Sequence, residues 1–202
     1  MKFLIIGHPK CGSKFFSQLM KEFTYNVGHE TMLNNGICYW QGVNTLKQFK
    51  QYYGPIRSLN DNYNHIIHYV RNPHDSLPSI MIENKHEESY KFRRDIIMHH
   101  YNIDMNDYND YEAAIISYIY WNLLAEGQGP NIRIKVEESP EQLAKYLNVD
   151  VPKGIPHTSL NSNGSKKKEF DYSKINKELY NKLNKIALRY NYPTITESIL
   201  KN

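Results

Sequence analysis

The sequence predicts an α/β protein in which helices flank a parallel sheet. The largely apolar runs at 3–6 and 66–70 have the length of buried strands, and neither shows the strict alternation of a strand with one face open to solvent. The first run is ended by Gly7 and the second by Asn72-Pro73, and each is followed by a helical pattern. Strands that alternate with helices favour a parallel sheet covered on both faces. We expect one domain over 1–202, because the chain has 202 residues and no internal repeat.

The remaining elements follow from periodicity and from the residues that end each pattern. A short strand is expected at 25–31 and another at 132–137, where apolar and polar residues alternate. The longest helix is expected at 108–126, because its apolar residues recur at helical spacing and a Gly-Gln-Gly-Pro segment follows. Further helices are expected at 15–23, 44–53, from about 75, and at 88–100, 140–147 and 172–190, with a loop at 55–63.

The break after the first strand predicts an anion site. Gly7 and Gly12 interrupt the apolar pattern before the first helix begins. A strand, a glycine-containing loop and a helix in that order gather backbone N–H groups at a helix N-terminus, where an anion is favoured. Lys10, Ser13 and Lys14 add charged and hydroxyl donors. We therefore expect a phosphate-like group to bind within the first 15 residues.

Two kinds of phosphate loop can be compared with this segment. The kinase loop G-x-x-x-x-G-K-[ST] has the same glycine spacing, but Ser13 and Lys14 reverse its last two positions, and no hydroxyl follows Lys14 to hold magnesium. The segment instead resembles the P-[KR]-S-G-[ST]-T-x loop with which sulfotransferases hold the 5′-phosphosulfate end of 3′-phosphoadenosine 5′-phosphosulfate (PAPS). This resemblance implies the following cofactor-binding residues: Pro9, Lys10, Cys11, Gly12, Ser13, Lys14 and Phe15. Lys14 departs from the family's Thr or Ser, and Phe15 is either an adenine-stacking ring or a core residue.

A second segment resembles the same family. Residues 69–79 match the sulfotransferase 3′-phosphate segment Y-[VIL]-R-[ND]-P-x-[DE]-x-x-x-S, and 132–137 resembles its R-[IVY]-x-[VY]-E-D strand. The resemblance implies that Arg71 and Ser79 bind the 3′-phosphate of PAPS. A guanidinium fork suits a phosphate dianion, which is consistent with that role. The fold implied is the P-loop-containing nucleotide hydrolase-like fold of sulfotransferases.

A third segment supplies a candidate general base. Sulfuryl transfer to an alcohol or amine needs a base near the acceptor and a cation near the leaving phosphate. Residues 28–31 resemble the G-E-E-T segment of tyrosylprotein sulfotransferases, which implies Glu30 as the base. His29 departs from that pattern and is the alternative base, and a third possibility is that Glu30 is only a capping or solvent carboxylate.

The lysine-rich run at 162–168 has two interpretations. It is either a flexible polar loop with a charge cluster or the late basic loop with which many sulfotransferases close over the cofactor. In the second interpretation, Lys166 and Lys167 reach the 3′-phosphate.

Net charge and residue composition limit the kinds of ligand and partner that we expect for this protein. The formal net charge of +4 suits an anionic nucleotide and is too small to indicate nucleic acid by itself. Cys11 and Cys38 are too few for a disulfide framework or a thiolate metal site, and no His-Glu cluster has metal-ligand spacing, so we expect no metal. The sequence has neither an apolar stretch long enough to span a membrane nor a signal peptide, so we expect a cytoplasmic protein. Oligomeric state is not indicated.

These observations predict a PAPS-dependent sulfotransferase. The sulfuryl group would move to a hydroxyl or amine acceptor by in-line displacement, with adenosine 3′,5′-bisphosphate as product. Glu30 would take the acceptor proton, and Lys10 would neutralise charge on the leaving phosphate. Two alternatives stay open, an ATP-dependent small-molecule kinase and a non-catalytic nucleotide-binding relic. The acceptor could be a glycan, tyrosine, steroid, lipid or small metabolite.

Overall fold

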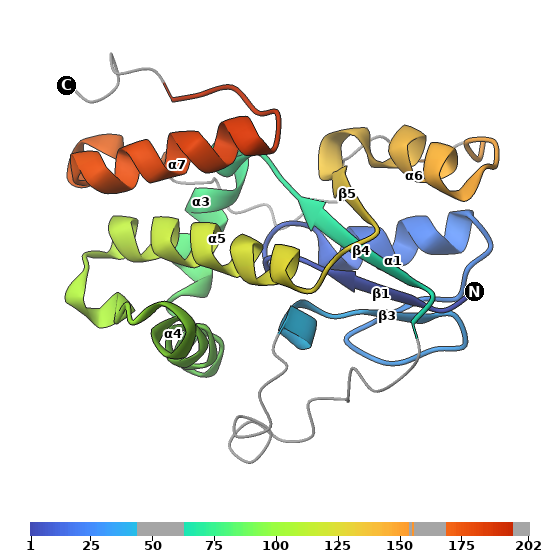
Figure 1. The fold of residues 1–202 in the computed structure, drawn as a ribbon, viewed down its shortest axis with the longest axis horizontal. Helices are drawn as coiled ribbons and strands as arrows, with labels where there is room; N and C mark the ends of the chain where they lie inside the picture. Colours follow the sequence, from blue (N-terminus) through green and yellow to red (C-terminus); the bar gives the residue numbers. More distant parts are fainter. Residues whose placement is uncertain (44–62, 154, 156–168, 196–202) are drawn as a thin grey trace. The chain divides into compact units, whose positions relative to one another are not determined.

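The computed structural model describes residues 1–43, 63–153, 155 and 169–195, and its contacts divide the chain into two compact units (Figure 1). The first unit comprises 1–71 and 124–165, and the second comprises 72–123 and 166–202. Each unit is therefore assembled from two separate stretches of chain, and the single domain over 1–202 stays a prediction. The expected helix at 44–53, the loop at 55–63 except for its last residue, and the candidate ligands Lys166 and Lys167 lie outside the described residues.

The first unit contains a five-stranded sheet in which every pair of neighbouring strands is parallel (Figure 1). The strand order is β2-β3-β1-β4-β5. The strands are β1 (Phe3–Ile6), β2 (Gly28–His29), β3 (Gly36–Cys38), β4 (His65–Val70) and β5 (Ile132–Lys135). The predicted α/β class with a parallel sheet flanked by helices is thus confirmed.

Three details of the sheet differ from the sequence prediction. The strand expected at 25–31 is only two residues long, and the one expected at 132–137 ends at 135, where the 3₁₀ helix η3 (Val136–Glu138) begins. Strand β3 is not predicted from the sequence. It has three residues and begins at a glycine, so it is too short to show a periodicity of its own.

Both faces of the sheet are covered, which explains the uninterrupted apolar sequence of β1. Helix α1 (Ser13–Glu22) lies on one face, where its Phe16 ring stacks on the Tyr69 ring of β4 with centroids 5.2 Å apart. Helix α6 (Ser139–Leu147) bonds to the same face of β4. The 3₁₀ helix η1 (Trp40–Val43) covers the other face, where Gly42 lies against Leu4 and Ile6. Strand β1 is therefore 0–1% exposed along its whole length.

The second unit is helical. It contains α3 (Pro73–Glu83), α4 (Glu87–Tyr101), most of α5 (Asp110–Gly127) and α7 (Lys177–Arg189), with the 3₁₀ turns η2 (Met105–Asp107) and η4 (Tyr172–Lys174). Tyr120 of α5 contacts both α4 and α7, since its ring centroid lies 4.6 Å from that of Tyr101 and its hydroxyl 3.5 Å from Lys182 Nζ. Helix α3 begins at residue 73, not near 75 as expected, because Asn72 caps it by accepting the His74 N–H at 3.0 Å.

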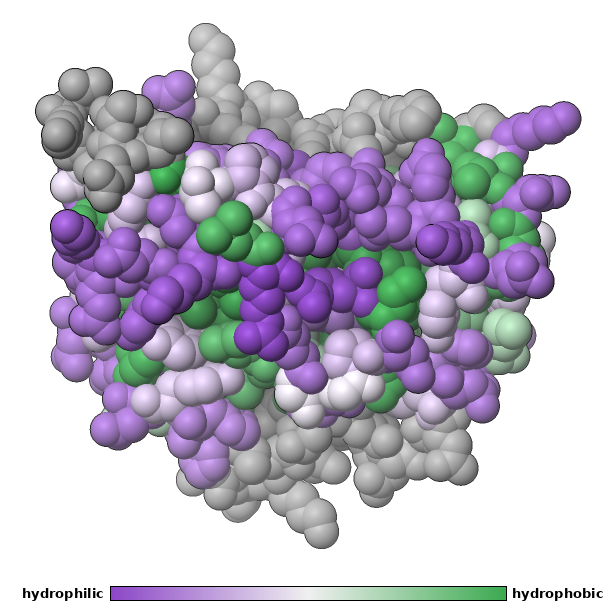
Figure 2. All heavy atoms as spheres, turned by 45° about the horizontal axis from the view of Figure 1, so that its top comes forward, coloured by the Kyte–Doolittle hydropathy of each residue, from purple (hydrophilic) through white to green (hydrophobic). Residues whose placement is uncertain are grey.

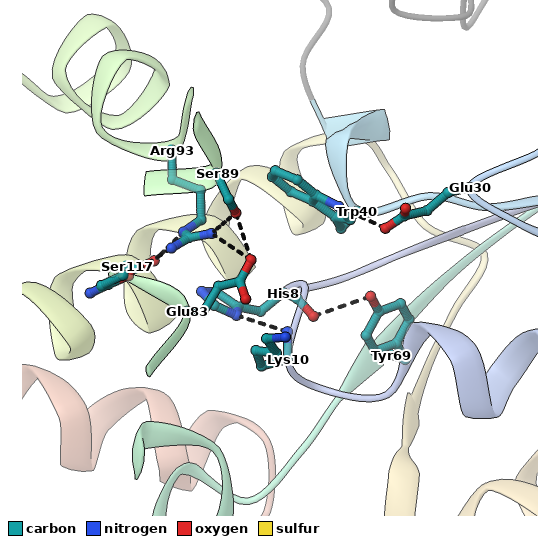
Figure 3. Close-up of polar contacts among 10 residues, drawn as sticks. His8, Lys10, Glu30, Trp40, Tyr69, Glu83, Ser89, Arg93 and Ser117 are labelled. Carbon is teal, nitrogen blue, oxygen red and sulfur yellow. Dashed lines mark hydrogen bonds and ion pairs between the residues drawn. The ribbon is translucent and has the colours of Figure 1, made fainter. Parts of the chain in front are cut away.

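A fully buried arginine joins three helices of the second unit. The Arg93 guanidinium on α4 donates to Ser117 of α5 at 3.0 Å, and to Ser89 and Asn84 at 2.6 Å each. Glu83 of α3 lies 4.0 Å away as its counter-ion (Figure 3). Burial lowers the pKa of Arg93 to about 10, although the Glu83 charge opposes that shift. Arg93 therefore stays charged at neutral pH. Its hydrogen-bond partners and its counter-ion satisfy the buried charge, which is the condition under which a protein tolerates one.

The molecular face drawn in Figure 2 is mainly hydrophilic, and its apolar areas are interrupted by polar side chains. Within the described ranges, no helix combines the length and the apolar composition that crossing a bilayer requires.

Candidate functional site

The carboxyl ends of the strands carry the predicted site residues of the first unit. In a parallel sheet these ends share one edge. The loop at 7–12 follows β1, Glu30 follows β2, Trp40 lies just beyond β3, and Arg71 follows β4. The chain leaves β1 toward β2 on one side and later returns as β4 on the other side, so strand order reverses at β1. Open α/β sheets bind ligands outside the carboxyl ends of strands at such a point.

The loop leads directly into an uncapped helix. Gly12 is the N-cap of α1 and has φ 116°, a left-handed conformation that glycine adopts without strain. The first intrahelical bond runs from the Phe16 N–H to the Gly12 carbonyl at 3.0 Å. No side-chain hydrogen bond among the described residues caps this end. The N–H groups of Ser13, Lys14 and Phe15, which precede the helical hydrogen-bond ladder, can therefore serve a ligand.

The N-terminus of α1 differs in charge from the N-termini of the other helices described. Helices α3 to α7 each carry an acidic residue in the first turn, as the helix dipole favours. The first turn of α1 carries no acidic residue and instead holds the exposed Lys14, while Lys10 is exposed on the preceding loop. A cation beside the positive end of a helix is unfavourable for the isolated protein. A bound anion would offset this repulsion, because it attracts both the lysine side chains and the positive end of the helix.

The loop backbone is held down on strand β4. The Tyr69 hydroxyl donates to the His8 carbonyl at 3.2 Å (Figure 3). The same carbonyl accepts the Cys11 N–H at 2.9 Å. Burial raises the pKa of Tyr69 well above its usual range, so the phenol remains a donor. A Cβ at Gly7 would lie 2.5 Å from the Tyr69 carbonyl oxygen, so only glycine fits there. Cys11 is fully buried, as expected for a small thiol that packs within the loop.

A row of polar side chains connects the loop with β2 and β3. Ser13 Oγ lies 3.0 Å from His29 Nε2, which lies 4.0 Å from the Glu30 carboxylate. The Trp40 indole N–H donates to the same carboxylate at 3.1 Å (Figure 3). Burial and then the Glu30 charge raise the pKa of the Cys38 thiol, which therefore stays neutral. The row thus links a hydroxyl at the helix N-terminus, an imidazole and an oriented carboxylate.

Glu30 has a strained backbone. Its φ is 56°, in the left-handed region that costs a non-glycine residue about 1–2 kcal/mol. The Glu30 N–H bonds to the Cys38 carbonyl at 3.0 Å, which holds this conformation. Strain of this kind concentrates at functional sites. The backbone is therefore compatible with a functional carboxylate, and the side chain is still 48% exposed.

The other predicted ligands have different surroundings. Arg71 is half-buried at the end of β4 in the first unit, whereas Ser79 lies on α3 in the second unit. Their joint contact with a 3′-phosphate stays a prediction. Phe15 is 9% exposed and packs edge-on against Phe16 at 5.7 Å, which favours the core role of the two left open. Pro9 lies in the turn before Lys10 and is partly exposed.

Sequence reasoning misses two supporting residues. The pattern around Trp40 indicates only a core or pocket-wall residue, yet the Trp40 N–H orients Glu30. Tyr69 belongs to the motif at 69–79, but its sequence context does not indicate that its hydroxyl anchors the loop across 61 residues of sequence. The available signal in both cases is position, because each aromatic residue lies at or just beyond the carboxyl end of a strand.

No family model, curated protein or solved structure matches the chain. Within the described residues, no group of three or more His, Cys, Asp or Glu side chains could hold a metal ion. The function is therefore inferred from the residues at the carboxyl ends of the strands and from their geometry.

Proposed function

We propose that the protein is a PAPS-dependent sulfotransferase with the P-loop-containing nucleotide hydrolase-like fold. The observation that carries this proposal is the uncapped N-terminus of α1, with Lys14 in its first turn and Lys10 on the loop before it. A helix end with free N–H groups and two nearby cations suits a phosphate or sulfate ester. The resemblance of the loop and of 69–79 to sulfotransferase segments supports PAPS as the anion.

The sequence motifs assign residues to the two ends of this donor. The loop N–H groups, Ser13 and Lys10 would hold the 5′-phosphosulfate, and Arg71 with Ser79 would hold the 3′-phosphate. When bound, PAPS supplies the sulfuryl group that the acceptor receives, and adenosine 3′,5′-bisphosphate remains. Lys10 and the loop N–H groups would stabilise negative charge on the phosphate end during transfer. Donors fixed in advance around developing charge supply much of the rate acceleration in many group-transfer enzymes.

Glu30 would accept the proton of the acceptor hydroxyl or amine. Its carboxylate is partly exposed, so an acceptor can reach it, and one oxygen is held by the Trp40 N–H. A positioned base contributes about 10²- to 10⁴-fold to the rate of such a reaction. His29 remains the alternative base, but its Nε2 is already in hydrogen-bond contact with Ser13.

Calorimetric titration tests the donor assignment. Adenosine 3′,5′-bisphosphate should bind far more tightly than AMP, and Arg71→Ala should weaken that binding by about 30- to 150-fold while leaving AMP binding almost unchanged. Arg133→Ala is the matched control, because Arg133 lies within β5 and pairs with Glu126 at 3.8 Å. Equal affinity of the wild type for the two nucleotides would refute the assignment. A strict magnesium requirement with ATP would favour a kinase.

Measurement of turnover distinguishes a sulfotransferase from a non-catalytic protein that only binds the nucleotide. Labelled PAPS is first used to screen glycans, tyrosine peptides, steroids, lipids and small metabolites for an acceptor. Glu30→Gln should then lower turnover by about 10²- to 10⁴-fold with bisphosphate affinity retained, whereas Glu22→Gln at the far end of α1 should change neither. Full activity of Glu30→Gln together with loss of activity in His29→Ala would transfer the base role to His29.

A further inference from the structure

We infer that Trp40 is a positioning residue that holds one oxygen of the Glu30 carboxylate and so leaves the other to take the acceptor proton. This inference rests on the proposed role of Glu30 as general base. Its basis is that both side-chain contacts of Glu30 meet the same oxygen, Oε1. The Trp40 indole N–H donates to Oε1 at 3.1 Å, and His29 Nε2 lies 4.0 Å from it (Figure 3). No hydrogen bond or ion pair from the described part of the chain reaches Oε2, and the Glu30 side chain is 48% exposed.

The direction of the Trp40 contact does not depend on a tautomer. An indole N–H only donates, and an ionised carboxylate only accepts. The two oxygens of a carboxylate are chemically equivalent, and rotation about the last side-chain bond exchanges them, so the contact does not select one particular atom. It fixes the plane of the group, because whichever oxygen meets the indole leaves the other in the Oε2 position.

The backbones of both partners are held by the sheet. Trp40 is 9% exposed and begins η1, in which Gly42 lies against side chains of β1. Glu30 directly follows β2, and its N–H bonds to the Cys38 carbonyl at the end of β3 at 3.0 Å. Because β2 and β3 are parallel neighbours, Glu30 and Trp40 both follow the same edge of the sheet. The contact therefore restricts only side-chain rotation.

The two oxygens then have different roles in sulfuryl transfer. The acceptor O–H or N–H bond breaks as its proton bonds to Oε2, and the electron pair left on the acceptor bonds to sulfur. The bond between sulfur and the 5′-phosphate oxygen breaks, and its electron pair leaves with adenosine 3′,5′-bisphosphate. Oε1 keeps the Trp40 N–H throughout. A base must lie within hydrogen-bond reach of the proton it takes, so a carboxylate that rotated freely would be in the productive orientation less often.

Nuclear magnetic resonance tests the contact itself. The chain has two tryptophans and so gives two indole N–H signals, of which Trp40→Phe identifies the one that belongs to Trp40. Glu30→Ala removes the acceptor and should move that signal upfield, because a hydrogen bond to a carboxylate deshields the proton. Glu22→Ala, at the far end of α1, is the matched control and should leave the signal in place. An unmoved Trp40 signal in Glu30→Ala would overturn the inference.

A double-mutant cycle tests whether Trp40 acts through Glu30. Sulfuryl transfer from PAPS to the acceptor found by screening, or to water in its absence, is measured in Trp40→Phe, in Glu30→Gln and in the double variant. A hydrogen bond to a charged group biases an orientation by about 10- to 150-fold, so Trp40→Phe should lower kcat by about tenfold or more with bisphosphate affinity retained. In the Glu30→Gln background the same substitution should have no further effect.

The outcomes of the cycle separate this inference from the proposed function. Trp121→Phe makes the same change in size at a fully buried position on α5 in the second unit, and it should lower Tm without changing kcat. An equal loss from Trp40→Phe in the wild-type and Glu30→Gln backgrounds would assign Trp40 a purely structural role, which overturns the inference and leaves the proposed function intact. If PAPS is transferred neither to an acceptor nor to water above the uncatalysed rate, both are overturned.

Discussion

Replacing Gly7 with alanine tests how the loop at 7–12 is held at the end of β1. The added Cβ would lie 2.5 Å from the Tyr69 carbonyl oxygen and 2.7 and 2.8 Å from two of its ring carbons. Tyr69 has little freedom to move, because its strand is paired with β1 and β5 and its ring stacks on Phe16 at 5.2 Å. Overpacking of this kind costs about 1–3 kcal/mol. Gly7→Ala should therefore lower Tm by about 2–12 °C.

The same substitution should weaken nucleotide binding if the loop relieves the clash by moving. Restoring the loop geometry on binding would then cost the same energy, which is a loss of about 5- to 150-fold in affinity for adenosine 3′,5′-bisphosphate. Gly127→Ala is the matched control, since it ends α5 with no atom within 4 Å of the added Cβ and should gain about 0.5–1 kcal/mol. Thermal unfolding and calorimetry measure both effects. Wild-type stability and affinity in Gly7→Ala would refute the reasoning.

Two further predictions concern the second unit. Arg93→Ala should lower the free energy of unfolding by about 3–5 kcal/mol, and Tm by about 6–20 °C, because it leaves Glu83 without its counter-ion. The control Arg94→Ala removes a partly exposed pair with Asp95 and should lower the free energy of unfolding by less than about 1 kcal/mol. Equal effects of the two substitutions would contradict the role of Arg93. Burial lowers the pKa of His74 from 6.5, more than Asp75 raises it, so the unfolded chain binds the proton more readily and stability should fall as pH drops below about 6.5. Thermal unfolding of His74→Gln between pH 7 and 5 should show a smaller fall than the wild type, and an identical slope would rule this contribution out.

Local sequence is sufficient for the elements that are buried on every side or clearly capped. Strands β1 and β4 are predictable because a strand covered on both faces has an uninterrupted apolar sequence. Helices α4, α5 and α6 are predicted to within about two residues from their periodicity and their flanking residues. The strand-loop-helix order at residues 3–22 is predictable for the same reason, since Gly7 and Gly12 lie within a few residues of β1 and α1, which they separate.

Elements that depend on distant partners are not predictable in the same way. Strand β3 has three residues and exists because β1 and β2 bond to it on either side. The expected strand at 25–31 is reduced to two residues, because only Gly28 and His29 find partners on β3. The pairing of Ser13 with His29 and of Trp40 with Glu30 likewise joins residues on separate elements. No periodicity in the sequence encodes such contacts.

The sequence by itself determined the α/β class, the parallel sheet and the place of the glycine-containing loop and helix N-terminus after β1, because each follows from short-range patterns of apolar, glycine and capping residues. Only the tertiary structure decided which side chains meet at the carboxyl ends of the strands. Parallel pairing brings together residues that follow different strands, so the contact of His29 with Ser13 and the support of the loop by Tyr69 depend on strand order. Strand order is set by long-range packing of the sheet and its helices, and the local sequence does not carry that information.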